Sequence, residues 1–239
     1  MRLFLILCWL SLPLLAWAYH VGPGQDQLAI DDANAMIRRA ALSETKGDYA
    51  AATDHYADAL AKLPEGDAKD RFAIQLAMAK TQMNSGKLPE ARVALEGLLD
   101  VMESADDCDP SLIVETRNTL ASSQYYMTWL MRLEGLPAEE WEPEIEASRQ
   151  HYRMLAETTR RQEGEQDAEQ FAAYQQDLES AIRLARMDLS ELQALKIPTQ
   201  CKGCCSGQCD KPGKKQSKKP GKKKDAGSNL GPLPDGSGS

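Results

Sequence analysis

The sequence predicts an all-α protein, and three observations support this prediction. Between Gln25 and Gln200, glycine and proline are sparse, while alanine, leucine, glutamate, glutamine and arginine are abundant. These five residue types are good helix formers. Apolar residues also recur at spacings of three and four, which is the period of one helix face. A β-sheet is therefore hard to place anywhere in this stretch.

The first 18 residues have the pattern of a secretory signal. Arg2 precedes an apolar run from Leu3 to Leu15, and Ala16-Trp17-Ala18 has the small-x-small form of a cleavage site. The run is shorter than the roughly 20 residues that a membrane-spanning helix needs, and an uncleaved N-terminal anchor is the alternative. We expect an exported protein, periplasmic or secreted, in which residues 19–28 form a linker to the helical body.

Charge is distributed unevenly along the chain. The formal net charge is −8, yet the segment from residue 200 onward holds nine lysines and only three aspartates. The preceding body is therefore strongly acidic. Because duplex phosphates are neutralised by clustered lysine and arginine, this composition argues against specific binding of nucleic acid by the body.

A repeated helix pair is visible within the body. The stretch from Gly47 to Pro64 has the form G-D-Y-x-x-A-x-x-x-Y-x-x-A-L-x-x-x-P. The glycine is placed to turn the chain between two antiparallel helices, Ala52 and Ala59 are small where these helices would touch, and Tyr56 would fill the gap. This pattern resembles the second helix of a tetratricopeptide repeat, and the resemblance implies stacked antiparallel helix pairs.

Two weaker copies follow. Gly86 stands 39 residues after Gly47 and is followed by Pro89 at a helix start. Gly135-Leu136-Pro137 repeats the arrangement a third time, in a more degraded form. We therefore expect repeats of this kind over residues 29–160, stacked as a superhelix.

Residues 161–197 predict a single amphipathic helix without a repeat signature. Its apolar residues step by threes and fours along one face: Phe171, Tyr174, Leu178, Ala181, Ala185, Leu189, Leu192 and Leu195. This helix is expected to cap the open end of the repeat stack. The alternative is a coiled-coil seam that joins two copies of the chain into a homodimer.

The resemblance also implies a binding surface. In tetratricopeptide proteins the first helices of the pairs line an inner groove that holds a peptide or an extended segment of another protein. Carried over by distance from each turn glycine, this partner-binding groove is lined by Asn34, Ile37, Glu44, Lys80, Asn84, Tyr125, Trp129 and Arg132. The alternative for the two aromatic residues is that they belong to the core.

Catalytic motifs are not found in the sequence. The three histidines, His20, His55 and His151, have no serine or cysteine at a recognisable motif spacing. A glycine-rich phosphate loop, a zinc-binding HExxH motif and a nucleophile elbow are also missing. We expect a non-enzymatic protein that needs no cofactor.

The tail, residues 198–239, has little apolar material to bury, and its composition predicts disorder. It begins with four cysteines in the pattern C-x2-C-C-x3-C: Cys201, Cys204, Cys205 and Cys209. In an oxidising compartment these form disulfides within the tail or with Cys108. The alternative is a site for a soft metal, zinc or copper, which thiolates at short spacing can bind.

The lysines of the tail form a basic segment that is suited to an anionic surface. Together these features predict an exported scaffold that binds another protein through a helical groove and uses its tail for attachment. A metal-handling protein that binds through its cysteine tail is the alternative. A third reading is an assembly module that acts through residues 165–197.

Overall fold

The computed structural model describes residues 23–64, 66, 68–161, 165–202 and 206, together with Trp9, residues 11–13 and Trp17. The predicted secretory signal therefore lies largely outside the described residues, and so does most of the tail. The described part of the chain is built from helices and contains no strand, which confirms the all-α prediction.

The helices follow one another with short connections. In chain order they are α2 (Pro23–Thr45), α3 (Tyr49–Lys62), α4 (Ala68–Asn84), α5 (Leu88–Ser104), α6 (Pro110–Leu133), α7 (Ala138–Thr159), α8 (Glu165–Arg186), α9 (Leu189–Ala194) and the short 3-10 helix η1 (Thr199–Cys201). The chain divides into two compact units, Met1–Met78 and Ala79–Ser239, and the boundary falls within α4.

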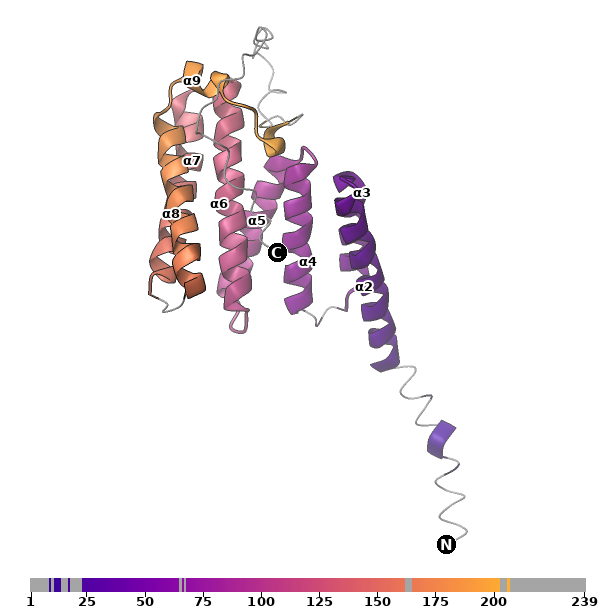
Figure 1. Ribbon diagram of the computed structural model, residues 1–239. Coiled ribbons are helices and arrows are strands. Elements are labelled where there is room, and N and C mark those ends of the chain that lie inside the picture. The colour runs from indigo at the N-terminus through magenta and orange to yellow at the C-terminus, as the bar shows by residue number, and fades with distance from the viewer. Residues whose placement is uncertain are drawn as a thin grey trace. The chain divides into compact units, whose positions relative to one another are not determined.

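Unit 1 is built on the pairing of α2 with α3, which run antiparallel (Figure 1). The contact between them is made by small residues: Ala40, Ala52 and Ala59 are fully buried. Tyr56 is also buried, and its hydroxyl donates a hydrogen bond of 3.3 Å to the Glu44 carboxylate. The burial of Ala52, Ala59 and Tyr56 agrees with the helix contact predicted for these three residues.

Unit 2 contains the end of α4 and the helices from α5 onward, and α6, α7 and α8 lie side by side in it (Figure 1). Its core includes Leu95 of α5, Leu120 of α6, Tyr152 of α7 and Leu184 of α8. Arg92 of α5 forms an ion pair of 2.8 Å with Glu144 of α7, which adds a polar link between two helices of this unit.

The three predicted turns are built in the same way. Gly47, Gly86 and Gly135 have positive φ angles of 73°, 80° and 75°. In each case the residue after the glycine donates its N–H to the carbonyl five positions earlier, over 2.9 to 3.1 Å. This is the Schellman arrangement, in which a left-handed residue ends a helix. The three sequence repeats therefore share one turn geometry.

The conformation at these turns predicts opposite effects for two glycine substitutions. A Cβ atom at Gly135 or at Gly97 would meet no atom within 4 Å, so sterics with neighbouring groups do not distinguish the sites. Gly135→Ala forces alanine into the left-handed region and should lower the free energy of unfolding by about 1–2 kcal/mol. Gly97→Ala lies within helix α5 and should raise it by about 0.5–1 kcal/mol. Urea unfolding followed by circular dichroism checks both, and two changes of the same sign would contradict the assignment.

Two boundaries differ from the sequence prediction. Helix α2 begins at Pro23, so the expected linker over residues 19–28 is partly helical. The expected continuous helix over residues 161–197 is wrong, because the chain leaves the helical path between α8 and α9. The reason is a capping box at Asp188, whose side chain accepts from the Glu191 N–H while Glu191 accepts from the Asp188 N–H.

Candidate functional site

Three residues assigned to the groove on α6 are buried in unit 2. Tyr125, Trp129 and Arg132 are only 4%, 2% and 9% exposed. The Tyr125 and Trp129 rings contact each other, with 6.1 Å between their centroids. The expectation that these side chains line an open groove is therefore corrected, and the burial agrees with the alternative that they are core residues.

The cause of this burial is the end of α8 and the segment that follows it. The Arg132 guanidinium donates hydrogen bonds to the carbonyl oxygens of Leu184 and Met187, at the C-terminal end of α8. It also lies over the Trp141 ring, 4.7 Å from the ring centroid. Burial lowers the pKa of Arg132, and the nearby Asp188 carboxylate acts in the opposite direction. Arg132 thus fastens α8 to α6.

The groove residues of α2 lie at the surface of unit 1. Asn34 is exposed, while Ile37 and Glu44 are half-buried at the edge of the core. Ile37 packs against the buried cluster that contains Ala40 and Tyr56. Burial, with a further effect of Glu44, raises the pKa of Tyr56 to about 12. This face therefore offers an exposed strip beside a packed core.

The groove residues of α4 that belong to unit 2 are already engaged with neighbours. Lys80 forms an ion pair with Glu115 of α6. The side-chain amide of Asn84 donates to the Lys80 carbonyl oxygen at 3.2 Å. Both side chains are half-buried. The structure thus places the eight predicted residues in three different environments rather than on one open surface.

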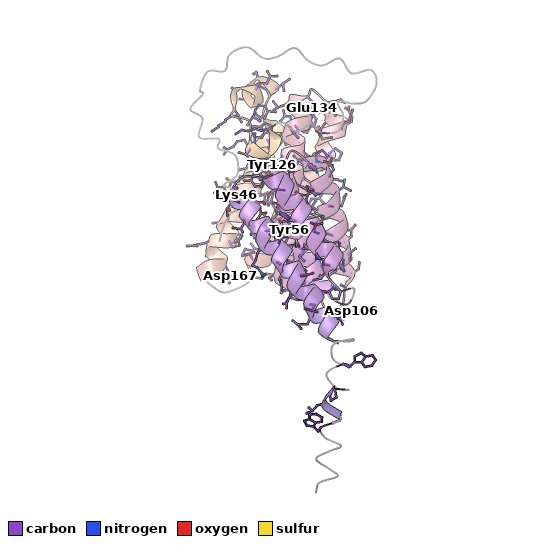
Figure 2. The ribbon with its side chains drawn as sticks, turned by 90° about the vertical axis from the view of Figure 1, so that its right-hand side faces the viewer. Lys46, Tyr56, Asp106, Tyr126, Glu134 and Asp167 are labelled. Carbon is purple, nitrogen blue, oxygen red and sulfur yellow. The ribbon has the colours of Figure 1, made fainter. Side chains whose placement is uncertain are left out.

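A cavity that the sequence did not reveal lies at the other end of α6, α7 and α8. Its volume is about 400 Å³, which is in the range of small-molecule sites. Asp167, one of its lining residues, is found in Figure 2 at the end of unit 2 opposite Tyr126 and Glu134. The lining residues are Pro110, Ile113, Val114, Arg117, Met154, Leu155, Thr158, Thr159, Asp167, Gln170 and Tyr174. The only pattern that could have pointed to the cavity is the spacing of Ile113, Val114 and Arg117, which lie on one face of α6.

Arg117 gives the cavity wall a positive charge that is partly balanced. Its guanidinium lies 3.1 Å from Nδ1 of His151 and also pairs with Glu103. Burial and the neighbouring Arg117 lower the pKa of His151 to about 4. His151 is therefore neutral at pH 7, and its Nδ1 accepts the hydrogen bond from Arg117.

A polar cluster lies further along the same three helices. Tyr152 is completely buried, and its hydroxyl is 2.9 Å from Oγ of Ser122. Burial raises the pKa of Asp177 on α8 to about 7. Burial is also the main cause of the raised pKa values of Tyr152 and Tyr174, and the Asp177 carboxyl adds to both. An acid of this kind can serve in proton transfer when a substrate reaches it. Asp177 is not among the residues that line the cavity described above.

Only two of the cysteines predicted to bind metal or form disulfides are described. Cys201 is 4% exposed, and its Sγ donates to the Tyr126 carbonyl oxygen at 3.6 Å. Cys108 is half-buried in the loop before α6. Cys204, Cys205 and Cys209 lie outside the described residues. Within the described ranges, no group of three or more His, Cys, Asp or Glu side chains is arranged to hold a metal ion.

The distance along α6 bears on one pairing within the disulfide prediction, that of Cys108 with Cys201. Cys108 precedes the helix start at Pro110, whereas Cys201 contacts Tyr126, which is roughly 24 Å further along the helix at 1.5 Å per residue. In Figure 2, Asp106 and Tyr126 accordingly lie toward opposite ends of unit 2. A disulfide requires Cα atoms within about 7 Å, so Cys108 and Cys201 cannot pair in this fold.

The fold and these sites define an all-α protein of antiparallel helix pairs joined by glycine turns. Comparison with protein-family models, with curated proteins and with solved structures gives no match. No helix within the described ranges is both long and apolar enough to span a bilayer.

Proposed function

We propose that this protein is an exported, non-enzymatic scaffold of tetratricopeptide-like repeats that binds a segment of another protein. The observation that carries the proposal is the threefold recurrence of one turn geometry at Gly47, Gly86 and Gly135. Repeated helix pairs present the same helix face several times, which suits recognition of extended segments. The signal-like first 18 residues support export, and the lysine-rich tail supports attachment to an anionic surface.

The surface that we propose for partner binding is the exposed strip of α2. Asn34 and Ala41 are both exposed and stand seven residues apart, so they lie on one side of the helix. They border the half-buried Ile37 and Glu44. Substitution there can change binding without removing a core contact, which makes the strip suitable for a direct test.

Site-specific photo-crosslinking in cells tests the proposal. A photoreactive phenylalanine analogue is placed at Asn34 or Ala41, and in matched controls at Ala57 or Asp58, which are exposed positions on α3. We expect one covalent adduct of the same mass from both α2 positions and none from the α3 positions. The adduct should disappear when Ala41→Arg is added to the Asn34 variant, because Ala41 is exposed and the long charged side chain would disturb the bound segment without removing a core contact.

The outcome of this experiment distinguishes the alternatives. Adducts of equal yield at all four positions would show random encounters rather than a groove. A complete lack of adducts from Asn34 and Ala41, with normal amounts of folded protein, would contradict partner binding by α2. Mass spectrometry of the adduct identifies the partner segment.

A further inference from the structure

The segment after α8 folds back over α6 in a regular manner. Every third residue of it is buried: Leu192 is 1% exposed, Leu195 is 7% exposed, Pro198 is buried and Cys201 is 4% exposed. Most residues between them, such as Gln193 and Lys196, are exposed, while Ile197 and Gln200 are half-buried. We refer to residues 189–201 as the strap. From Leu192 onward its buried residues follow the pattern L-x-x-L-x-x-P-x-x-C. The strap consists of the short helix α9, an extended stretch and the 3-10 helix η1.

Contacts hold the strap at both ends. Just before the strap, the Arg132 guanidinium donates hydrogen bonds to the carbonyl oxygens of Leu184 and Met187. The capping box at Asp188 then sets the direction of α9. At its end, Cys201 donates to the Tyr126 carbonyl oxygen. Just beyond, the Ser206 N–H donates to the Glu134 carboxylate at 2.9 Å. The strap therefore lies against the C-terminal half of α6, in agreement with the contacts of α9 and η1 with that helix.

The C-terminal half of α6 contains a buried hydrogen-bond donor without a partner among the described residues. The indole Nε1 of Trp129 is buried and has no hydrogen-bond partner among the described residues. Trp129 is one turn beyond Tyr125 and Tyr126 on the same helix, and its ring contacts Tyr125. A buried donor without a partner lowers stability, so a ligand that brings a carbonyl oxygen to this position would be favoured.

We propose that the α6 surface formed by Tyr125, Tyr126, Trp129 and Glu134 is a peptide-binding site that the strap occupies in cis. This inference rests on the proposed scaffold function and names the class of partner. The partner is a protein segment with the chemistry of the strap, namely two leucines and a proline at three-residue spacing. It competes with the strap for the surface and places a carbonyl oxygen against the Trp129 N–H.

The strap acts in this arrangement as an autoinhibitory segment. A tethered ligand has an effective concentration in the millimolar range, so it outcompetes a weak partner in solution. Only the fraction of molecules with an open strap binds the partner, which lowers the apparent affinity by that fraction. Substitutions that weaken the strap should therefore strengthen binding in trans.

A fluorescent peptide with the sequence of residues 188–201, carrying serine in place of Cys201, tests this competition. Its binding to the full chain is measured by fluorescence anisotropy for three proteins: the wild type, Leu192→Asp/Leu195→Asp, and the matched control Gln193→Asp/Ala194→Asp. The control adds the same two charges at exposed positions of the strap. We expect the first variant to bind the peptide at least about tenfold more tightly than the wild type and the control, because its strap is released. A peptide with both leucines changed to aspartate should bind none of the three.

Alkylation of Cys201 by a maleimide reports independently whether the strap is open. Trypsin releases Ile197–Lys202, which contains Cys201 as its only cysteine. The labelling rate of this peptide should rise in Leu192→Asp/Leu195→Asp, and it should rise in the wild type when excess strap peptide is added. Circular dichroism confirms that each variant remains helical.

Two results would overturn the proposal. Faster labelling of Cys201 without peptide binding would show an open strap over a surface that binds nothing of this kind. Unchanged labelling in the Leu192→Asp/Leu195→Asp variant would show that the two leucines do not hold the strap. Either result leaves the crosslinking at Asn34 and Ala41 unaffected, so this proposal and the scaffold function can fail separately.

Discussion

Replacement of Arg132 by alanine is expected to destabilise unit 2 by about 3 kcal/mol, because hydrogen bonds from a buried charged group contribute about 1.5–3 kcal/mol each. The substitution leaves the carbonyl oxygens of Leu184 and Met187 without their donor, and these belong to a helix end that lacks intrahelical partners. It also removes the guanidinium that lies over Trp141. Urea unfolding followed by far-UV circular dichroism measures the loss.

Two further variants make the Arg132 prediction specific. Arg132→Lys keeps the charge but lacks the planar fork that reaches two carbonyls, so it should lose about half as much stability. Arg153→Ala removes an exposed arginine from α7 and should change the free energy of unfolding by less than about 0.5 kcal/mol. If Arg132→Ala were as stable as Arg153→Ala, the fastening of α8 to α6 by this side chain would be refuted.

The second large effect concerns pH and involves Asp177 and His151. Burial raises the pKa of Asp177 to about 7, from about 4 in the unfolded chain. Between about pH 4 and pH 7, Asp177 is therefore more often protonated in the folded chain than in the unfolded chain. The stability that Asp177 contributes at pH 4 is lost as the pH rises to 7. Burial and Arg117 lower the pKa of His151 to about 4 from about 6.5, so its contribution is present above pH 6.5 and is lost as the pH falls to 4.

The two contributions oppose each other in the wild type, and single substitutions separate them. Asp177→Asn should leave a protein whose stability rises between pH 4 and 6.5, by about 2 kcal/mol after allowance for partial solvent screening. His151→Gln should leave one whose stability falls by a similar amount between pH 4 and 7. The physical reason is that each variant retains only one of the two opposing pKa shifts.

Urea unfolding at a series of pH values between 4 and 8 measures these profiles. Glu179→Gln is the matched control for Asp177→Asn, because Glu179 is an exposed acid on the same helix. Its profile should follow the wild type. Parallel profiles for Asp177→Asn and the wild type would contradict the role assigned to burial of this carboxyl.

Much of the local structure was predictable from the residues alone. The glycines at 47, 86 and 135 marked the turns because a left-handed helix end favours the residue without a Cβ atom. Ala52 and Ala59 marked the helix contact because only small side chains let two helices approach closely. These signals depend on a few neighbouring residues, so they can be recognised in the sequence without a structure.

The position of the candidate sites was less predictable. Distance from the turn glycine assigned Tyr125, Trp129 and Arg132 to an open groove, but it carried no information on what covers that part of α6. The break at Asp188 was also missed, because the apolar period of three to four continues through Leu189, Leu192 and Leu195. A short helix and an extended strap can bury residues at nearly the same spacing as one long helix.

The sequence by itself determined the helical class, the positions of the three turns and the small residues at the helix contacts, since each follows from local backbone preference and side-chain size. Only the tertiary structure decided that Arg132 binds the end of α8, that Cys201 lies against Tyr126 and that Cys108 is too distant to pair with it. These relations join residues 52 to 93 positions apart. They depend on how the helices pack, and no local pattern encodes them.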